Sequence, residues 1–162
     1  MILEALKVVS SPLGRIALAA TSRGVAQLEI LTDTAKPKEF SNSQKASQLL
    51  EDAATQLAEY FASRRQGFDL ALDLQGTEFQ MSVWQELLNI DFGATKSYGE
   101  VALAVSKPLA ARAVGGAVGA NPVPIIVPCH RVMGSTGKLT GYSATGGVQT
   151  KTKLLQLEGV LK

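Results

Sequence analysis

The chain has 162 residues and a mass of 17.1 kDa, enough for one ordinary domain or two small ones. Hydrophobic residues make up 46% of it, and no apolar run approaches the roughly 20 residues that cross a bilayer. The first residues lack the basic and long apolar segments of a signal peptide. We therefore expect a soluble, cytoplasmic protein with no membrane contact.

The chain contains one Cys and one His, which excludes an internal disulfide and, from this chain alone, a zinc site. The formal net charge of +2 is too small to indicate nucleic-acid binding, but its distribution is uneven. Residues 1–76 carry eight basic and nine acidic side chains, whereas residues 77–162 carry eight basic and five acidic.

The stretch between Glu100 and Glu158 holds no acidic residue. Its basic residues are Lys107, Arg112, Arg131, Lys138, Lys151 and Lys153. Two interpretations are open: chance spacing of charges on a solvated surface, or a surface that faces phosphates.

Residues 1–75 have the pattern of a small α+β domain. Apolar segments separated by turn signals predict strands at Leu3–Val9, Arg15–Ala20 and Val25–Leu31. A polar linker is expected from Thr32 to about Asn42, an amphipathic helix over 43–63 and an alternating edge strand at Phe68–Leu74. We interpret this part as a scaffold, because it carries no obvious chemistry.

Residues 76–162 are expected to form a second domain that begins with helices. Thr77 is a candidate N-cap for a helix with an apolar stripe of Phe79, Val83, Trp84, Leu87 and Leu88. Ser97 can cap a short helix from Tyr98 to about Val105, and Pro108 suits the first turn of a helix that runs to about Gly119. Two helices joined by a short turn predict a helix-turn-helix.

The second helix of this pair has almost no bulky side chains and a single Arg. A glycine within a helix lowers the stability of the helix by about 1 kcal/mol relative to alanine. The small residues of this helix therefore require an explanation. Either they allow tight packing against a neighbouring helix, or they allow the helix to approach a narrow nucleic-acid groove.

Beyond this helix the sequence predicts irregular structure and then a last helix. Asn121-Pro-Val-Pro is rigid, and an apolar run leads into Pro128-Cys-His-Arg-Val132. A hairpin or loops are expected for the region of Gly134, Gly137, Gly141, Gly146 and Gly147. An amphipathic helix with Leu154, Leu155 and Leu157 closes the chain at Gly159.

Cys129 is either a small buried hydrophobe or a nucleophile. Its neighbours include His130 and Arg131, and cationic neighbours favour the reactive thiolate. In an extended segment adjacent side chains point to opposite faces, so a turn or a bridging water is needed to connect His130 with the sulfur. A cysteine hydrolase would reopen its thioester with water, whereas an alkylated cysteine stays alkylated.

The C-terminal half resembles the methylated-DNA–protein-cysteine methyltransferases, or O6-alkylguanine-DNA alkyltransferases. The signature Pro-Cys-His-Arg-Val at 128–132 lies in its wider frame, over about residues 77–159. The other matching motifs are Ser97-Tyr-Gly, Ala111-Arg-Ala-Val-Gly115, Asn121-Pro, Gly141-Tyr-Ser, Lys151 and Leu154-Leu with Glu158-Gly. The resemblance implies a ribonuclease-H-like domain followed by a winged-helix-like domain with a helix-turn-helix.

The resemblance also implies a single-turnover repair reaction on double-stranded DNA, without metal or cofactor, by a protein that we expect to be monomeric. Cys129 would accept the alkyl group from O6 of a flipped guanine. His130 would take the cysteine proton through a water, and Glu158 would orient the His. Asn121 would brace the active-site turn, and Tyr98 would help to rotate the nucleotide and protonate the departing guanine.

Further residues are implied in binding DNA and base. Arg112 would enter the duplex from the minor groove and replace the extruded base. The other expected DNA contacts are Tyr98, Lys107, Ala113 and Gly115. The base pocket would be lined by Tyr142, Ser143 and Val132.

Several of these residues also have simpler explanations. Tyr98 could pack in the core, and Glu158 could be solvated near the C-terminus. Arg112 could pair with Glu100, and Asn121 could cap the preceding helix.

Two segments depart from the family pattern. Ile90-Asp-Phe-Gly93 stands where Ile-Pro-x-Gly is common, and the Tyr142–Gly147 loop is two residues longer than usual. The structural zinc of some relatives is excluded here, because no Cys or His precedes Cys129.

Three other functions compete with this one. An alkyltransferase-like lesion sensor would lack the signature cysteine. A winged-helix transcription regulator would have an inert Cys129, and a cysteine hydrolase would turn over many times.

Overall fold

The computed structural model describes residues 1–135, 137, 139, 142 and 144–162. The chain divides into two compact units, Met1–Gln75 and Gly76–Lys162. Within the described ranges, none of the helices combines the length and the apolar character that a membrane span requires. The class is α+β, as expected from the sequence.

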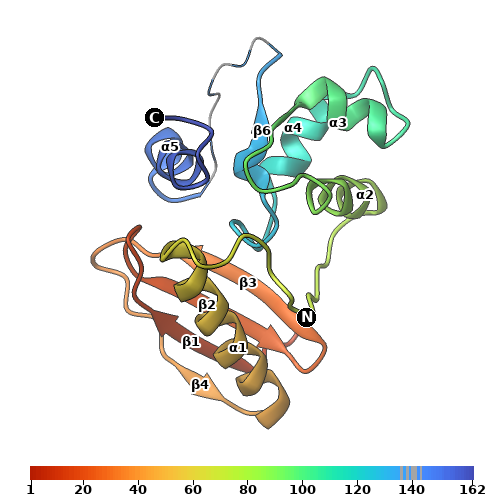
Figure 1. Ribbon diagram of the computed structural model, residues 1–162. Helices are drawn as coiled ribbons and strands as arrows, with labels where there is room; N and C mark the ends of the chain where they lie inside the picture. The colour runs from red at the N-terminus through yellow and green to blue at the C-terminus, as the bar shows by residue number, and fades with distance from the viewer. Residues whose placement is uncertain (136, 138, 140–141, 143) are drawn as a thin grey trace. The chain divides into compact units, whose positions relative to one another are not determined.

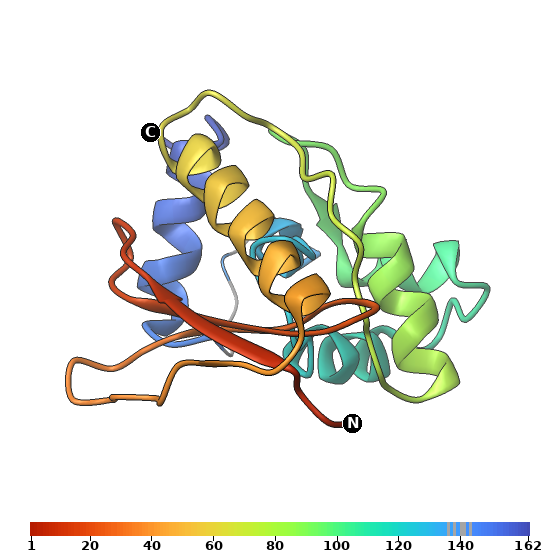
Figure 2. The same ribbon diagram turned by 90° about the horizontal axis from the view of Figure 1, so that it is seen from below.

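The first unit is a four-stranded antiparallel sheet with one helix (Figure 1). Its strands are β1 (Ala5–Val9), β2 (Ile16–Thr21), β3 (Gly24–Ile30) and β4 (Phe40–Ser41), in the order β3-β2-β1-β4. Helix α1 (Gln44–Phe61) contacts all four strands and crosses one face of the sheet (Figure 2). It begins at the predicted place because the Ser43 side chain accepts a hydrogen bond from the N–H of Ala46.

Two predictions for this unit are wrong. The polar linker contains β4, which pairs with Ala5 and Leu6 and is too short to show a period in the sequence. The expected edge strand at 68–74 is reduced to one parallel bridge between Leu72 and Val25. At that bridge, a Cβ on Gly24 would lie 2.6 Å from the Leu72 carbonyl carbon, so only glycine allows this close approach.

The second unit contains the other helices and a two-stranded parallel sheet. Its elements are α2 (Glu78–Leu87), β5 (Lys96–Ser97), α3 (Tyr98–Ala104), α4 (Ala111–Gly119), η1 (Cys129–Arg131), β6 (Val132–Met133) and α5 (Gly147–Leu157). Thr77 and Ser97 are the N-caps of α2 and α3, as predicted, and both form complete capping boxes. Helices α2, α3 and α4 contact one another, and the buried Trp84 ring N–H donates to the Ala117 carbonyl at 2.8 Å.

The predicted helix-turn-helix is present as α3 and α4, but α4 begins later than expected. Ser106 adopts φ 61°, and the Lys107 N–H bonds back to the Ala102 carbonyl, which ends α3. The Ala110 N–H then donates to the Lys107 carbonyl at 2.9 Å and closes a turn with Pro108 at its second position. Pro108 therefore belongs to the turn and not to the first turn of α4.

Candidate active site

A cavity of about 320 Å³ in the second unit brings together residues from five separate segments. Its described lining residues are Tyr98, Gly115, Val118, Gly119, Cys129, Tyr142 and Lys151. Cys129 is 3% exposed as a residue, but it borders this cavity and is therefore not sealed within a packed core. Tyr98 is half-buried at the start of α3, so the simpler explanation of a core tyrosine is wrong.

Cys129 lies in a 3-10 turn and not in an extended segment. Its N–H donates to the Val127 carbonyl at 2.8 Å. The side chain of Asn121 braces the preceding loop, because its Nδ2 donates to the same carbonyl at 2.8 Å and its Oδ1 accepts from the Val123 N–H at 3.0 Å. This bracing holds a loop in which Ile125 adopts φ 77°, a conformation that a β-branched residue rarely takes.

The surroundings of Cys129 act on its ionisation in opposite directions. Burial raises the pKa of the Cys129 thiol above its ordinary range, while hydrogen bonds from Asn121 and Tyr142 and the charge of Lys151 partly oppose this. The sequence-based expectation that Arg131 favours the thiolate is wrong, because that guanidinium is engaged elsewhere.

His130 and Arg131, which follow the cysteine in sequence, form a buried cluster with Glu158. The Glu158 carboxylate accepts from Arg131 Nε at 2.8 Å and from Arg131 Nη2 at 2.9 Å, a bidentate pair. Its Oε2 also lies 2.7 Å from His130 Nε2. Arg131 Nη1 donates to the Ile90 carbonyl at 2.6 Å, and its guanidinium lies 5.9 Å from the Phe92 ring centroid. Glu158 is 4% exposed, so the prediction that it could be solvated is wrong.

This cluster keeps His130 neutral. Burial lowers the pKa of His130, and Glu158 opposes that effect while Arg131 and Lys151 add to it. Because Arg131 compensates the Glu158 charge, a neutral His130 can donate its Nε2–H to the carboxylate. Nδ1 makes no hydrogen bond to the described part of the chain, so it is the ring nitrogen that is available to accept a proton.

A pH dependence of stability follows from the burial of His130. The unfolded chain binds a proton below about pH 6.5, whereas the folded chain resists it, so stability is lost as the pH falls from 7 to 5.5. We expect a loss of up to about 1.4 kcal/mol per pH unit in urea unfolding, followed by the fluorescence of Trp84, the single Trp. His130 is the single His, so His130→Gln should flatten the curve in this window. An equally steep curve in that variant would contradict the assignment.

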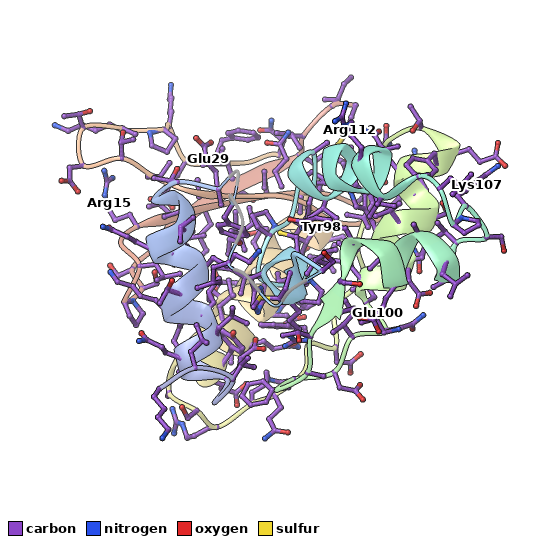
Figure 3. The ribbon with its side chains drawn as sticks, turned by 90° about the horizontal axis from the view of Figure 1, so that it is seen from above. Arg15, Glu29, Tyr98, Glu100, Lys107 and Arg112 are labelled. Atoms are coloured by element: carbon purple, nitrogen blue, oxygen red, sulfur yellow. The ribbon has the colours of Figure 1, made fainter. Side chains whose placement is uncertain are left out.

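The exposed side of the helix-turn-helix carries positive charge. Arg112 and Lys107 are exposed, and Figure 3 shows Arg112 extending from α4 on the side away from α3. Glu100 lies on the opposite side of the pair, where its carboxylate accepts from the Ser97 N–H at 3.0 Å. No ion pair joins Glu100 and Arg112 in the described residues, so the alternative of a pair between them is wrong.

The small residues of α4 are divided between its two faces. Val114, Ala117 and Val118 are buried, whereas Arg112, Ala113 and Gly116 are exposed. A Cβ on Gly116 would meet nothing within 4 Å, and one on Gly115 would lie 3.9 Å from the Tyr98 ring, an ordinary contact. Packing inside this unit therefore does not require glycine at either position.

Gly116→Ala is expected to stabilise the protein. Alanine is favoured over glycine by about 0.5–1 kcal/mol within a helix, and here its methyl group faces open space. Urea unfolding followed by Trp84 fluorescence measures the gain. Gly24→Ala is the opposite control, since its Cβ would collide with the backbone of Ala71 and Leu72. A loss of stability in Gly116→Ala would contradict the open surroundings described for this residue.

Sequence reasoning missed Lys151 as a site residue. Lys151 lines the cavity and is 1% exposed, and its ammonium donates to the Val132 carbonyl at 2.6 Å. The signal was present, because Lys151 shares the apolar face of α5 with Leu154 and Leu155 at helical spacing.

The structure describes some of the remaining predicted residues and not others. Val132 is buried, Tyr142 lines the cavity, and Ala113 lies on the exposed face of α4. Ser143, like Lys138 and Gly141, lies outside the described residues. Among the residues that are described, no three His, Cys, Asp or Glu side chains group as ligands for a metal ion.

Two models of one protein family together match almost the whole chain. The family model described as 6-O-methylguanine DNA methyltransferase, ribonuclease-like domain, matches residues 6–74. The model for the DNA binding domain of the same proteins matches residues 78–160.

Two individual relatives are both named methylated-DNA–protein-cysteine methyltransferase. A methylated-DNA–protein-cysteine methyltransferase of Mycobacterium tuberculosis is 45% identical over 152 residues, 94% of this chain and 90% of the relative. One from Methanosarcina barkeri is 43% identical over 154 residues, 93% of this chain and 94% of the relative. An M. tuberculosis protein solved in complex with DNA has a TM-score of 0.82 and 45% identity, with 94% of this chain and 91% of that chain covered. With its two domains in this order, the chain belongs to the methylated-DNA–protein-cysteine methyltransferase family.

Proposed function

We propose that this protein repairs DNA by transferring the alkyl group of O6-alkylguanine to the sulfur of Cys129, once per chain. The observation that carries the proposal is that the single cysteine borders a cavity of about 320 Å³ next to a buried His130–Glu158 pair. A flipped base could enter such a cavity, which a reaction inside a stacked duplex requires. The family relative solved with DNA supports DNA as the partner.

The proposed reaction begins with loss of the thiol proton to His130 through a water. The thiolate then attacks the alkyl carbon, a C–S bond forms, and the C–O bond to guanine breaks with its electron pair on the base. The phenol of Tyr98 supplies the proton that the departing guanine needs. Because water does not hydrolyse the resulting thioether, Cys129 is consumed.

Other side chains have proposed positioning roles. Glu158 orients His130, and Asn121 braces the turn that carries the nucleophile. Tyr142 and Ser143 flank the alkylated side of the base. The Val132 carbonyl keeps a second lone pair for the base after bonding to Lys151.

For DNA binding we propose that α4 lies in the minor groove, with Arg112 in place of the extruded base and with Lys107, Ala113 and Gly115 as further contacts. The exposed face of small residues supports this geometry. The alkyl acceptor and the proposed DNA contacts lie in one unit, so the proposed reaction needs only a monomer. A DNA substrate agrees with the cytoplasmic location expected from the sequence.

A duplex that carries O6-methylguanine with a radiolabelled methyl group tests the proposed function. We expect one equivalent of label per chain, on the peptide that contains Cys129. A cysteine hydrolase would release label continuously, and a lesion sensor or transcription regulator would bind without accepting label. Either result would overturn the proposal.

The proposed groove contact has its own test. Gly116→Leu adds a bulky side chain on the exposed face of α4, where the protein itself has space, so we expect weaker DNA binding with an unchanged fold. Gly116→Ala is the matched control for the change in backbone freedom. Fluorescence anisotropy with a labelled duplex, at a fixed salt concentration, measures both variants. Equal affinity of Gly116→Leu and Gly116→Ala would place α4 outside the groove.

A further inference from the structure

Leu109 is the most exposed large apolar residue in the described part of the chain. It is 100% exposed and lies in the turn that joins α3 to α4. Leucines are exposed singly on many protein surfaces, so exposure by itself assigns no role. Two further features distinguish this leucine: hydrogen bonds hold the backbone around it, and its neighbours along the chain include two exposed cations.

The backbone on both sides of Leu109 is held in place. The hydrogen bond between the Ala110 N–H and the Lys107 carbonyl closes the turn, and Pro108 fixes one of its two central φ angles. The Ala110 carbonyl accepts from the Val114 N–H at 2.8 Å, which connects the turn to α4. Because little backbone freedom remains to be lost when a partner covers this side chain, its burial favours binding.

The charges around Leu109 suit an anionic partner. Lys107 precedes it by two residues and Arg112 follows it by three, and both are exposed. No Asp or Glu lies between Glu100 and Glu158 in the sequence, and Glu100 lies on the opposite side of the helix pair from Arg112 (Figure 3). An apolar side chain flanked by cations fits the DNA backbone, in which a deoxyribose separates each phosphate from its base.

We propose that Leu109 is a DNA-binding residue that packs on a deoxyribose at the edge of the minor groove. The inference rests on the proposed function, in which Lys107 contacts DNA and Arg112 enters the duplex. A lysine meets phosphate and an intruding arginine meets the base stack, so a residue between them in the chain meets the sugar. Leu109 does not line the cavity around Cys129, so it contributes to DNA affinity and not to the chemical step.

Leu109→Ala and Leu109→Gln test this contact. Because the residue is fully exposed, both variants should keep the urea unfolding curve of wild type. We expect each to bind an unmodified labelled duplex about fivefold or more weakly in fluorescence anisotropy, since the apolar contact is lost. Leu109→Met keeps an apolar side chain of similar size and should bind within about twofold of wild type.

Leu103→Ala is the matched control. Leu103 is also exposed, at 67%, but it shares one face of α3 with Glu100 at helical spacing. The Glu100 carboxylate repels phosphates, so we expect the affinity of this variant to stay within about twofold of wild type. A loss equal to that of Leu109→Ala would be a general effect of removing an exposed leucine and would overturn the proposal.

Salt dependence separates an apolar contact from a contact with phosphate. The slope of log affinity against log salt concentration should be unchanged in Leu109→Ala, whereas Lys107→Met should reduce it by about 1. A reduced slope in Leu109→Ala would mean that a phosphate contact was lost, and wild-type affinity would mean that Leu109 makes no contact with DNA. Either result overturns the proposal.

Transfer and stoichiometry complete the test. With the radiolabelled duplex, Leu109→Ala should reach the wild-type maximal rate at saturating duplex and should be slower at limiting duplex. A lower maximal rate would contradict the proposal. A loss of affinity that sedimentation finds only with two chains per duplex would also overturn it, because Leu109 would then contact a second copy of the chain. Wild-type protein that accepts no label overturns the proposed function instead, and the affinities for unmodified duplex still test Leu109.

Discussion

Cys129→Ala is expected to abolish the transfer of label from an O6-methylguanine duplex completely. The chain has no second cysteine, so no other thiol can accept the methyl group. The substitution removes one buried sulfur atom beside an existing cavity, so the fold should persist. The measurement is label bound to protein after incubation with excess duplex, with wild type at one equivalent per chain.

Binding of the modified duplex is the internal control for this variant. The proposed contacts with DNA lie on α4 and in the turn before it, not at the sulfur, so the affinity should stay within about twofold of wild type at a fixed salt concentration. Retained affinity with no transfer assigns the chemistry to Cys129. Label on Cys129→Ala at the wild-type level would show that the acceptor is another residue.

The second large effect is expected from Glu158→Gln. This carboxylate compensates the buried Arg131 and accepts from His130, so the neutral amide leaves a guanidinium in the interior without its counter-charge. Breaking a buried pair in this way costs about 3–5 kcal/mol, a large share of the stability of an ordinary domain. Urea unfolding followed by Trp84 fluorescence measures the loss, and single-turnover transfer should slow because His130 loses its orienting partner.

Glu86→Gln is the matched control for this experiment. Glu86 pairs with Lys96 at 3.3 Å in the same unit, but both side chains are partly exposed, at 20% and 35%. An exposed ion pair contributes at most about 1 kcal/mol, so this variant should be nearly neutral in stability and in transfer. Equal losses for the two variants would mean that the Glu158 pair has no special role.

Local structure was predictable where a few neighbouring residues decide it. Thr77 and Ser97 begin helices because each side chain accepts from an N–H three residues on, a contact that depends on adjacent sequence only. The edge strand at 68–74 failed for the opposite reason. Its backbone could pair only with the partner available in space, which was the single residue Val25.

Some features of the candidate site were likewise predictable from the sequence, and others were not. The sequence by itself determined the family and the order of the two domains and predicted Cys129 as the nucleophile, because these depend on residue types at set spacings. Tertiary structure decided which charges meet. It directed Arg131 to Glu158, 27 residues further on, and brought Lys151 to the cavity that Cys129 borders. Electrostatic interactions depend on distance in space and on burial, neither of which can be read from separation along the chain.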